Sequence, residues 1–340
     1  MRFSNWMIGI TGALAAMMGA AAAADKPLPP FSIASQGSFF LGGRDIQSNT
    51  LSTRANSGGT VTVDQVYVRY QIPAKAGKRH PITFIHGCCL TGKTWESTPD
   101  GRMGWDEFFL RQGHPVYVLD QAGRGRSATD PTNINAVKLG QAPVEKLPQV
   151  SFASHEGAWT LFRFGATNGE TNPGLQFPLE AQAEFWKQMV PDWIGALPTP
   201  NPTVPALSDL ATRLKGTVLV SHSQSGLYPF LAAARSTDGI AGIVAIEPAN
   251  CPAPADSMAP YVKFPILVLF GDFVAQSPVW STKLKECSAF RDAANAAGGK
   301  VEVVALPDVG FHGNSHMLME DRNSLDIARW LAKWIDGHIG

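Results

Sequence analysis

Residues 218–226 read VLVSHSQSG and form the most informative stretch of this sequence. An apolar run ends in a cluster of small residues with Ser223 at its centre, and an amphipathic segment follows. The pattern is typical of a strand that turns sharply into a helix and presents one side chain at the apex. Serine stands at both flanking positions, Ser221 and Ser225, where G-x-S-x-G has glycine, so the signature is met only in its loose form. Taken alone, the pattern also fits a purely structural serine-rich turn.

Three further segments support a functional interpretation. Residues 81–87 (PITFIHG) predict a strand running into a His-Gly loop, and residues 116–127 (VYVLDQAGRGRS) predict the next strand and a glycine-rich turn. Residues 301–307 (VEVVALP) predict a strand before the histidine-bearing loop 310–316 (GFHGNSH). As a set, from about residue 65 to residue 339, these motifs resemble the α/β-hydrolase superfamily, which carries nucleophile, acid and histidine in this chain order. The resemblance implies a nucleophilic Ser223.

The position of the acid is a choice between two carboxylates. Asp272 follows the strand that usually carries the acid in this superfamily, whereas Glu247 ends the strand directly after the nucleophile helix. A small group of secreted bacterial esterases, which the HGCCL stretch at 86–90 resembles, uses a glutamate there. Because glutamate is one methylene longer, it can reach a histidine from the neighbouring strand. We therefore favour Glu247, with Asp272 as the alternative and as an ordinary turn residue otherwise.

Two histidines compete in the last loop. His316 lies in a Gly-Asn-Ser-His segment just before the final helices, whereas His312 is flanked by a glycine and fits a solvated loop residue. We assign His316 as the base, oriented by Glu247. The backbone N–H groups of Gln224 and of Cys88 or Cys89 would then hold the oxyanion.

The N-terminus predicts export. A short basic start, an apolar run and a small-residue region at 21–24 are typical of a signal peptide over residues 1–24, ahead of one domain at 25–340. We therefore expect a secreted or periplasmic protein. Zero net charge without a basic run argues against nucleic-acid binding, and no apolar stretch beyond the leader is long enough to span a membrane.

Export changes the interpretation of the four cysteines. In an oxidising compartment an even number predicts disulfides, here Cys88–Cys89 in the oxyanion loop and Cys251–Cys287. The resemblance to the secreted esterases implies the same for the adjacent pair. A metal site is disfavoured because neither pair has C-x-x-C spacing, and free thiols are the remaining alternative.

The wider pattern predicts a mostly parallel central sheet with helices on both faces, an α/β fold. Strands are expected near 36–41, 61–73, 81–86, 115–120, 217–222, 241–247, 265–270 and 301–306. The first two are expected to form an antiparallel ribbon at the N-terminal edge. The long, aromatic-rich connection at about 130–215 is interpreted as a cap insertion before the nucleophile strand.

These expectations predict a serine esterase that cleaves small-molecule carboxylic esters through an acyl-enzyme, without metal or cofactor. Lactonase, amidase and acyltransferase chemistry on the same scaffold are alternatives, as is a secreted binding module without activity. The sequence leaves the substrate and the oligomeric state open, including a homodimer.

Overall fold

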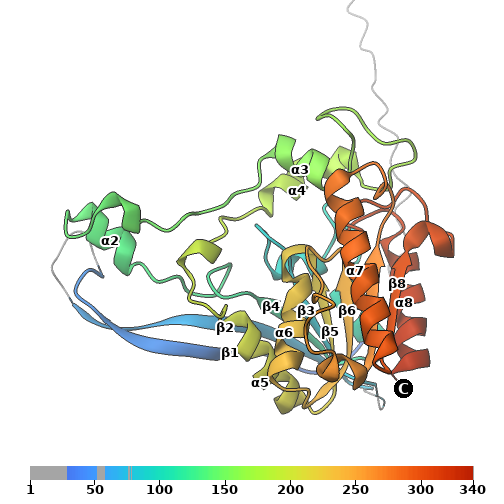
Figure 1. Cartoon of the computed structure of the whole chain (residues 1–340), viewed down its shortest axis with the longest axis horizontal. Helices are drawn as coiled ribbons and strands as arrows, with labels where there is room; N and C mark the ends of the chain where they lie inside the picture. The colour runs from blue at the N-terminus through green and yellow to red at the C-terminus, as the bar shows by residue number, and fades with distance from the viewer. Residues whose placement is uncertain (1–28, 52–57, 76, 78, 340) are drawn as a thin grey trace, which may run out of the picture. The chain divides into compact units, whose positions relative to one another are not determined.

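The computed structural model describes residues 29–51, 58–75, 77 and 79–339. The predicted signal peptide at residues 1–24 lies outside the described residues. Residues 32–340 group into one compact unit, built on a sheet of eight strands in the order β1-β2-β4-β3-β5-β6-β7-β8 (Figure 1). The strands are β1 (Ile33–Ser48), β2 (Gly59–Pro73), β3 (Ile82–Ile85), β4 (Val116–Asp120), β5 (Thr217–His222), β6 (Ile240–Ile246), β7 (Pro265–Phe270) and β8 (Lys300–Ala305).

The sheet is parallel from β4 through β8, and β1 and β2 join its edge antiparallel. Every residue of β3 and β5 is buried. Such uninterrupted burial is characteristic of strands covered on both faces, which explains their continuous apolar sequence. The predicted fold class, with its N-terminal antiparallel ribbon, is confirmed.

Helices cover both faces of the sheet. They are α1 (Trp105–Arg111), α2 (Thr132–Lys138), α3 (His155–Leu161), α4 (Gln182–Lys187), α5 (Thr203–Leu214), α6 (Tyr228–Arg235), α7 (Pro278–Ala296) and α8 (Ser324–His338). Side chains of α5, α6 and α7 share one core with the sheet. On another part of the sheet α1 packs against α8, where the Trp105 Nε1 donates to the Ser324 carbonyl at 3.1 Å. No helix among the described residues is long and apolar enough to cross a bilayer.

The connection between β4 and β5 contains α2, α3, α4 and α5, with 3-10 turns between them. Its last helix, α5, packs against α6 and belongs to the domain core. The segment before α5 gathers buried aromatic side chains around Phe164, whose ring stacks on Phe177 at 4.2 Å. Some of the insertion's aromatics therefore pack its own small core.

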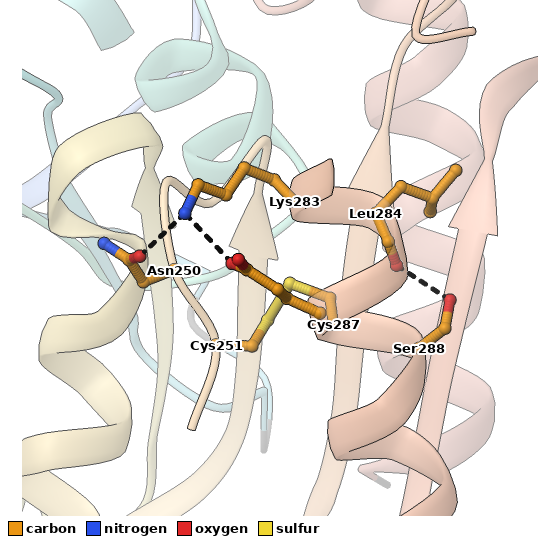
Figure 2. Close-up of a disulfide and its surroundings, with 7 residues drawn as sticks. Asn250, Cys251, Lys283, Leu284, Cys287 and Ser288 are labelled. Carbon is orange, nitrogen blue, oxygen red and sulfur yellow. Dashed lines mark hydrogen bonds and ion pairs between the residues drawn. A yellow bond between two sulfur atoms is a disulfide. The ribbon is translucent and has the colours of Figure 1, made fainter. Parts of the chain in front are cut away.

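One of the predicted disulfides joins the loop after β6 to α7. Cys251 and Cys287 are bonded, and the Lys283 Nζ beside them donates to the Asn250 Oδ1 at 3.1 Å (Figure 2). The bridge spans 36 residues of chain. It ties the end of the strand that carries Glu247 to a helix on the sheet face.

We expect the double variant Cys251→Ser/Cys287→Ser to lose about 3–4 kcal/mol of unfolding free energy, because a loop of this length is no longer closed in the unfolded chain. Guanidinium denaturation of oxidised parent and double variant measures the difference. Identical midpoints and slopes would show that this bridge adds no stability.

Candidate active site

The turn at Ser223 is tight and backbone-strained. Ser223 directly follows β5 and has φ of 57°, a left-handed conformation that non-glycine residues rarely adopt. A 3-10 turn, Ser223–Leu227, leads into α6. A side chain at Gly226 would collide with Pro248, so this position needs glycine. Strain of this kind costs about 1–3 kcal/mol and persists where surrounding structure enforces it.

Ser225 explains why the loose signature still forms this turn. Its Oγ accepts from the His222 N–H at 3.2 Å and lies 3.0 Å and 3.2 Å from the carbonyls of His222 and Ile85, to one of which it can donate. A glycine at this position would offer no side-chain hydrogen bond. The Ser225 hydroxyl instead links the turn to His222 at the end of β5 and to Ile85 of β3. Ser221, at the other flanking position, is buried and its Oγ has no hydrogen-bond partner among the described residues.

The structure brings Glu247, not Asp272, to His316. The Nδ1 of His316 lies 3.2 Å from the Glu247 Oε2, and both side chains are fully buried. Asp272 instead accepts the N–H of Gly313 at 2.8 Å on Oδ2 and that of Phe273 at 2.7 Å on Oδ1. It therefore anchors the start of the histidine loop. His312 is not part of this buried cluster.

His316 is held from several sides. Its backbone N–H donates to the Phe162 carbonyl at 2.9 Å, and the Phe162 ring stacks on the imidazole with centroids 5.2 Å apart. Trp280 lies over the same ring at 4.3 Å. The His222 ring, next to Ser223, lies 4.6 Å from it, and His222 Nε2 is 3.0 Å from the His316 carbonyl. The Nε2 of His316 is buried with no partner in the described part of the chain, so it is free to accept a proton.

A buried arginine, which the sequence analysis missed, completes this cluster. Arg163 follows α3 and pairs with both carboxylate oxygens of Glu247: its Nη1 donates to Oε2 at 3.0 Å and its Nη2 donates to Oε1. Both side chains are buried. The only sequence signal is a charged residue between two phenylalanines in an aromatic-rich segment, and that signal does not point to β6.

Burial and charge act in opposite directions on these groups. Burial would raise the pKa of Glu247, but the Arg163 guanidinium and the His316 hydrogen bond outweigh it and lower the pKa to about 2. Burial lowers the pKa of His316, which the Glu247 contact partly offsets and the Arg163 charge reinforces. Glu247 is therefore ionised and His316 neutral in the resting site, the protonation states that a general base and its orienting acid require.

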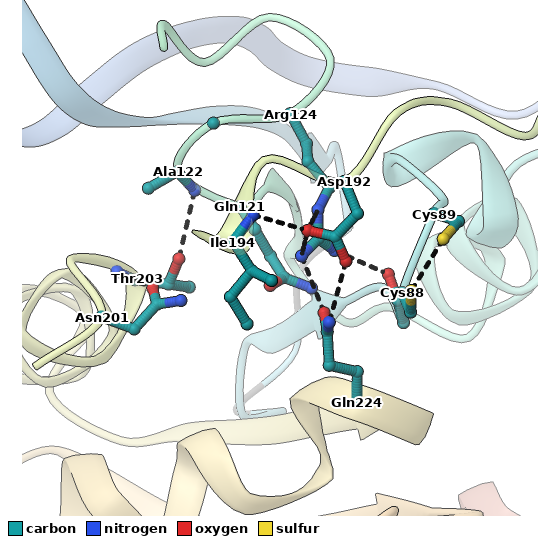
Figure 3. Close-up of polar contacts among 12 residues, drawn as sticks. Cys88, Cys89, Gln121, Ala122, Arg124, Asp192, Ile194, Asn201, Thr203 and Gln224 are labelled. Atoms are coloured by element: carbon teal, nitrogen blue, oxygen red, sulfur yellow. Dashed lines mark hydrogen bonds and ion pairs between the residues drawn. The ribbon is translucent and has the colours of Figure 1, made fainter. Parts of the chain in front are cut away.

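The candidate oxyanion loop follows β3. Gly87 lies close to the nucleophile turn, where an added Cβ would stand 2.9 Å from the Ser223 Cβ. The Arg124 Nη1 donates to the Gly87 carbonyl at 3.0 Å, and its Nη2 donates to the Gln224 Oε1 at 2.7 Å (Figure 3). The Gln224 Nε2 donates to the Asp192 Oδ2 at 2.8 Å, and Arg124 and Asp192 form a fully buried ion pair. One network thus fixes both segments that carry the candidate oxyanion donors.

The predicted Cys88–Cys89 disulfide is not formed in this structure. No bond joins the two Sγ atoms, which lie 2.7 Å apart. A disulfide bond measures about 2.05 Å, and a bridge between adjacent residues also needs a strained connecting peptide. The Cys89 carbonyl accepts from the Val190 N–H at 2.9 Å, which ties the loop to the insertion.

Asp192 stands within 4.8 Å of the two thiols, which makes these three residues a conceivable metal-ligand set. Its Oδ1, however, accepts from the Arg124 Nε and Nη2 and from the Ile194 N–H, and its Oδ2 accepts from Gln224. With both oxygens engaged and a buried guanidinium beside it, this carboxylate is poorly suited to bind a cation.

Two buried acids follow His316, and the sequence analysis missed both. The Asp321 Oδ2 accepts from the Ser315 N–H at 2.8 Å and from the Asn314 Nδ2 at 2.9 Å, while Oδ1 accepts from the Ser315 Oγ at 2.7 Å. Asp321 thus holds the loop that carries His316 through hydrogen bonds to the two residues before it. Glu320 accepts from the Gln188 Nε2 at 2.9 Å and 3.0 Å. Burial raises the pKa of Asp321 to about 7 and that of Glu320 to about 8.

The raised pKa of Glu320 predicts a specific pH dependence of stability. The folded protein keeps this proton up to about pH 8, whereas the unfolded chain releases it near the ordinary value of 4.5. The contribution of Glu320 to the free energy of unfolding is therefore full below pH 4.5 and is lost as the pH rises towards about 8. We expect Glu320→Gln, which cannot ionise, to lose less unfolding free energy than the parent between pH 5 and pH 8.

Urea denaturation of parent and variant at the two pH values measures this effect. Shifted groups remote from Glu320, such as His222, are present in both proteins, so the comparison reports Glu320 together with its coupling to Asp321. Glu184→Gln, at an exposed position on α4, is the matched control and should follow the parent. Parallel pH profiles for parent and Glu320→Gln would contradict the prediction.

The comparisons with known proteins agree with this geometry. A bacterial esterase whose structure was solved at atomic resolution is 58% identical, with 92% of this chain and 99% of that chain covered and a TM-score of 0.89. A probable secreted lipase from Fungal sp. (strain ATCC 74256) is 28% identical over 330 residues, 82% of this chain and 87% of its own length. No protein-family model matches the chain. The chain therefore belongs to the α/β-hydrolase superfamily, in the family of the bacterial esterase to which it is 58% identical.

Proposed function

We propose that this protein is a secreted serine esterase that cleaves carboxylic esters through an acyl-enzyme. Ser223 attacks the ester carbonyl as His316 takes its proton on Nε2, and Glu247 holds the Nδ1 proton and stabilises the imidazolium. Water then releases the acyl group with His316 again as base. The observation that carries the proposal is a buried His316 with Nδ1 on an ionised Glu247 and Nε2 unpartnered, beside the strand end that carries Ser223.

The oxyanion is proposed to be bound by the backbone N–H groups of Gln224 and of Cys88 or Cys89. The buried network of Arg124, Asp192 and Gln224 supports this assignment because it anchors both segments before substrate arrives. Preorganised donors of this kind typically contribute 10²–10³ in turnover each.

The cellular location and the insertion complete the proposal. The leader at 1–24, the Cys251–Cys287 disulfide and the name of the fungal relative, a secreted lipase, support an extracellular protein. The insertion before α5 is proposed to act as a cap that presents an apolar wall to the ester. Association into a homodimer stays a prediction.

A fluorophosphonate probe and a series of p-nitrophenyl esters test the proposal. We expect stoichiometric labelling of the mature protein at Ser223, located by peptide mapping, together with hydrolysis of esters from acetate to palmitate at a rate that depends on chain length. Labelling with turnover of a lactone or amide but of no simple ester would favour the alternative chemistries. A folded protein that neither reacts with the probe nor turns over any ester would instead be a binding module.

A further inference from the structure

We propose that Arg163 is a positioning residue for the catalytic pair, supplied by the insertion, and that it sets both the direction of Glu247 and the pH at which His316 works. The inference rests on the proposed function. It assigns the insertion a part in the catalytic machinery in addition to covering the site.

The geometry shows one guanidinium aligning the acid. Two nitrogens of Arg163 pair with the two oxygens of Glu247, a bidentate arrangement that fixes the plane of the carboxylate. The third nitrogen, Nε, donates to the carbonyl of Asp272 at 2.8 Å, so the guanidinium also bridges to the end of β7. The Gly271 N–H donates to the Glu247 Oε1 at 2.5 Å. Only Oε2 faces the histidine, at 3.2 Å.

The backbone around Arg163 is built to hold this pose. Arg163 has φ of 61°, and its carbonyl accepts from the Asn172 Nδ2 at 2.8 Å. The carbonyl before it, on Phe162, accepts the N–H of His316, and the carbonyl of Leu161 accepts from the Trp280 Nε1 at 2.7 Å. Three successive residues of the insertion are therefore bonded to the histidine loop, to α7 or to the acid. These bonds fix the backbone that carries Arg163 relative to the histidine loop and α7.

The charged groups near His316 indicate how Arg163 should affect the protonation of the Glu247–His316 pair. Four titratable groups from separate elements lie at His316 or at its partners. Glu247 after β6 bonds the imidazole Nδ1, and Arg163 from the insertion pairs with Glu247. His222 at the end of β5 contacts the His316 carbonyl, and Asp321 bonds the neighbouring Ser315. His222 is buried and its pKa lies well below the ordinary value, since burial and the neighbouring His316 both disfavour its charge. Asp321 is held by Asn314 and Ser315 and does not bond the imidazole. Arg163 is thus the cation that balances Glu247.

Removing Arg163 should shift the protonation of the Glu247–His316 pair in one direction. Glu247 and His316 share a hydrogen bond and titrate as a pair. With Arg163 present the pair's negative charge is compensated, so protons bind to it less readily. Without Arg163 the pair takes up a proton at higher pH. The acid limb of the kcat/KM profile reports the pKa of the essential base in the free enzyme, here His316. This limb should therefore move to higher pH.

Three variants separate charge from geometry. We expect Arg163→Gln to lower kcat about 10²-fold through misorientation of the pair and to shift the acid limb upwards by about one pH unit. Arg163→Lys keeps the charge but not the bidentate contact, so kcat should fall while the acid limb stays in place. In the Glu247→Gln background, Arg163→Gln should cause little further loss, because its effect passes through Glu247.

The matched control is Arg329→Gln on α8, whose exposed side chain pairs with Asp326, and it should resemble the parent in rate and pH profile. Circular dichroism and thermal melting are recorded for every variant, so that loss of fold is recognised as such. Should Arg163→Gln fail to fold, Arg163→Lys and the double variant still decide the question. Failure of the proposed function would appear separately, as a parent enzyme that the fluorophosphonate does not label. Three results would each overturn the positioning role: full kcat in Arg163→Lys, an unmoved acid limb in a folded Arg163→Gln, or Arg163 and Glu247 effects on kcat that simply multiply in the double variant. Arg163 would then be a structural link only.

Discussion

Replacing Ser223 with alanine is expected to abolish ester hydrolysis, with a loss of turnover of roughly 10⁶-fold, the scale seen when a catalytic serine is removed elsewhere. The oxygen is the only atom lost, and alanine occupies the same left-handed backbone position at a similar cost. Folding should therefore change little. Initial rates on p-nitrophenyl acetate and fluorophosphonate labelling measure the loss of activity, and the melting temperature measures folding.

The two neighbouring serines provide the comparison. Ser221 is buried without a hydrogen-bond partner among the described residues, so Ser221→Ala should keep both activity and stability. Ser225 ties the turn to His222 and Ile85, so Ser225→Ala should lose stability along with activity. An inactive but fully stable Ser221→Ala, beside an active Ser223→Ala, would show that the nucleophile has been misplaced.

Glu247→Gln is expected to lower kcat by about 10³–10⁴-fold, because an amide can present its N–H to the histidine and favour the wrong tautomer. The Nε2 that should accept the serine proton would then carry one. The effect should be larger than that of Arg163→Gln, since Glu247 bonds the imidazole itself. Steady-state kinetics across pH, with the melting temperature as the check on folding, measure it.

Asp272→Asn is the matched carboxylate-to-amide control. Asp272 accepts backbone N–H groups from Gly313 and Phe273 and makes no bond to His316, so its loss should cost turnover far less. If Asp272→Asn proved the more damaging of the two, the acid would belong on β7 and the assignment of Glu247 would fall.

The strand pattern and the Ser223 turn could be predicted because their signals are local. β5 and β6 are buried on both faces and read as continuous apolar runs, so their positions follow from composition over six or seven residues. The edge ribbon was predicted too short, at 36–41 for its first strand, because β1 runs from Ile33 to Ser48 with polar and glycine positions that carry little strand signal.

The contacts of the insertion could not be predicted. Arg163 meets a glutamate 84 positions away. Asp192 forms a fully buried ion pair with Arg124 and accepts a hydrogen bond from the partly buried Gln224. A buried ion pair depends on where two chain segments cross, and no periodicity in either segment records that crossing. The raised pKa values of Glu320 and Asp321 have the same origin, since burial by distant segments causes them.

The two predicted disulfides differ in the same way. An even cysteine count in an exported chain predicts disulfides, Cys251 and Cys287 are the two left once the adjacent pair is set aside, and the structure contains that bond. Whether Cys88 and Cys89 bond depends on the backbone at one peptide, and in this structure no bond joins them. Local patterns in the sequence were therefore enough to predict the strands, the serine turn and the candidate residues. Which carboxylate reaches His316 and which cation balances it could be seen only in the folded chain, because both depend on burial and distance between segments far apart in the chain.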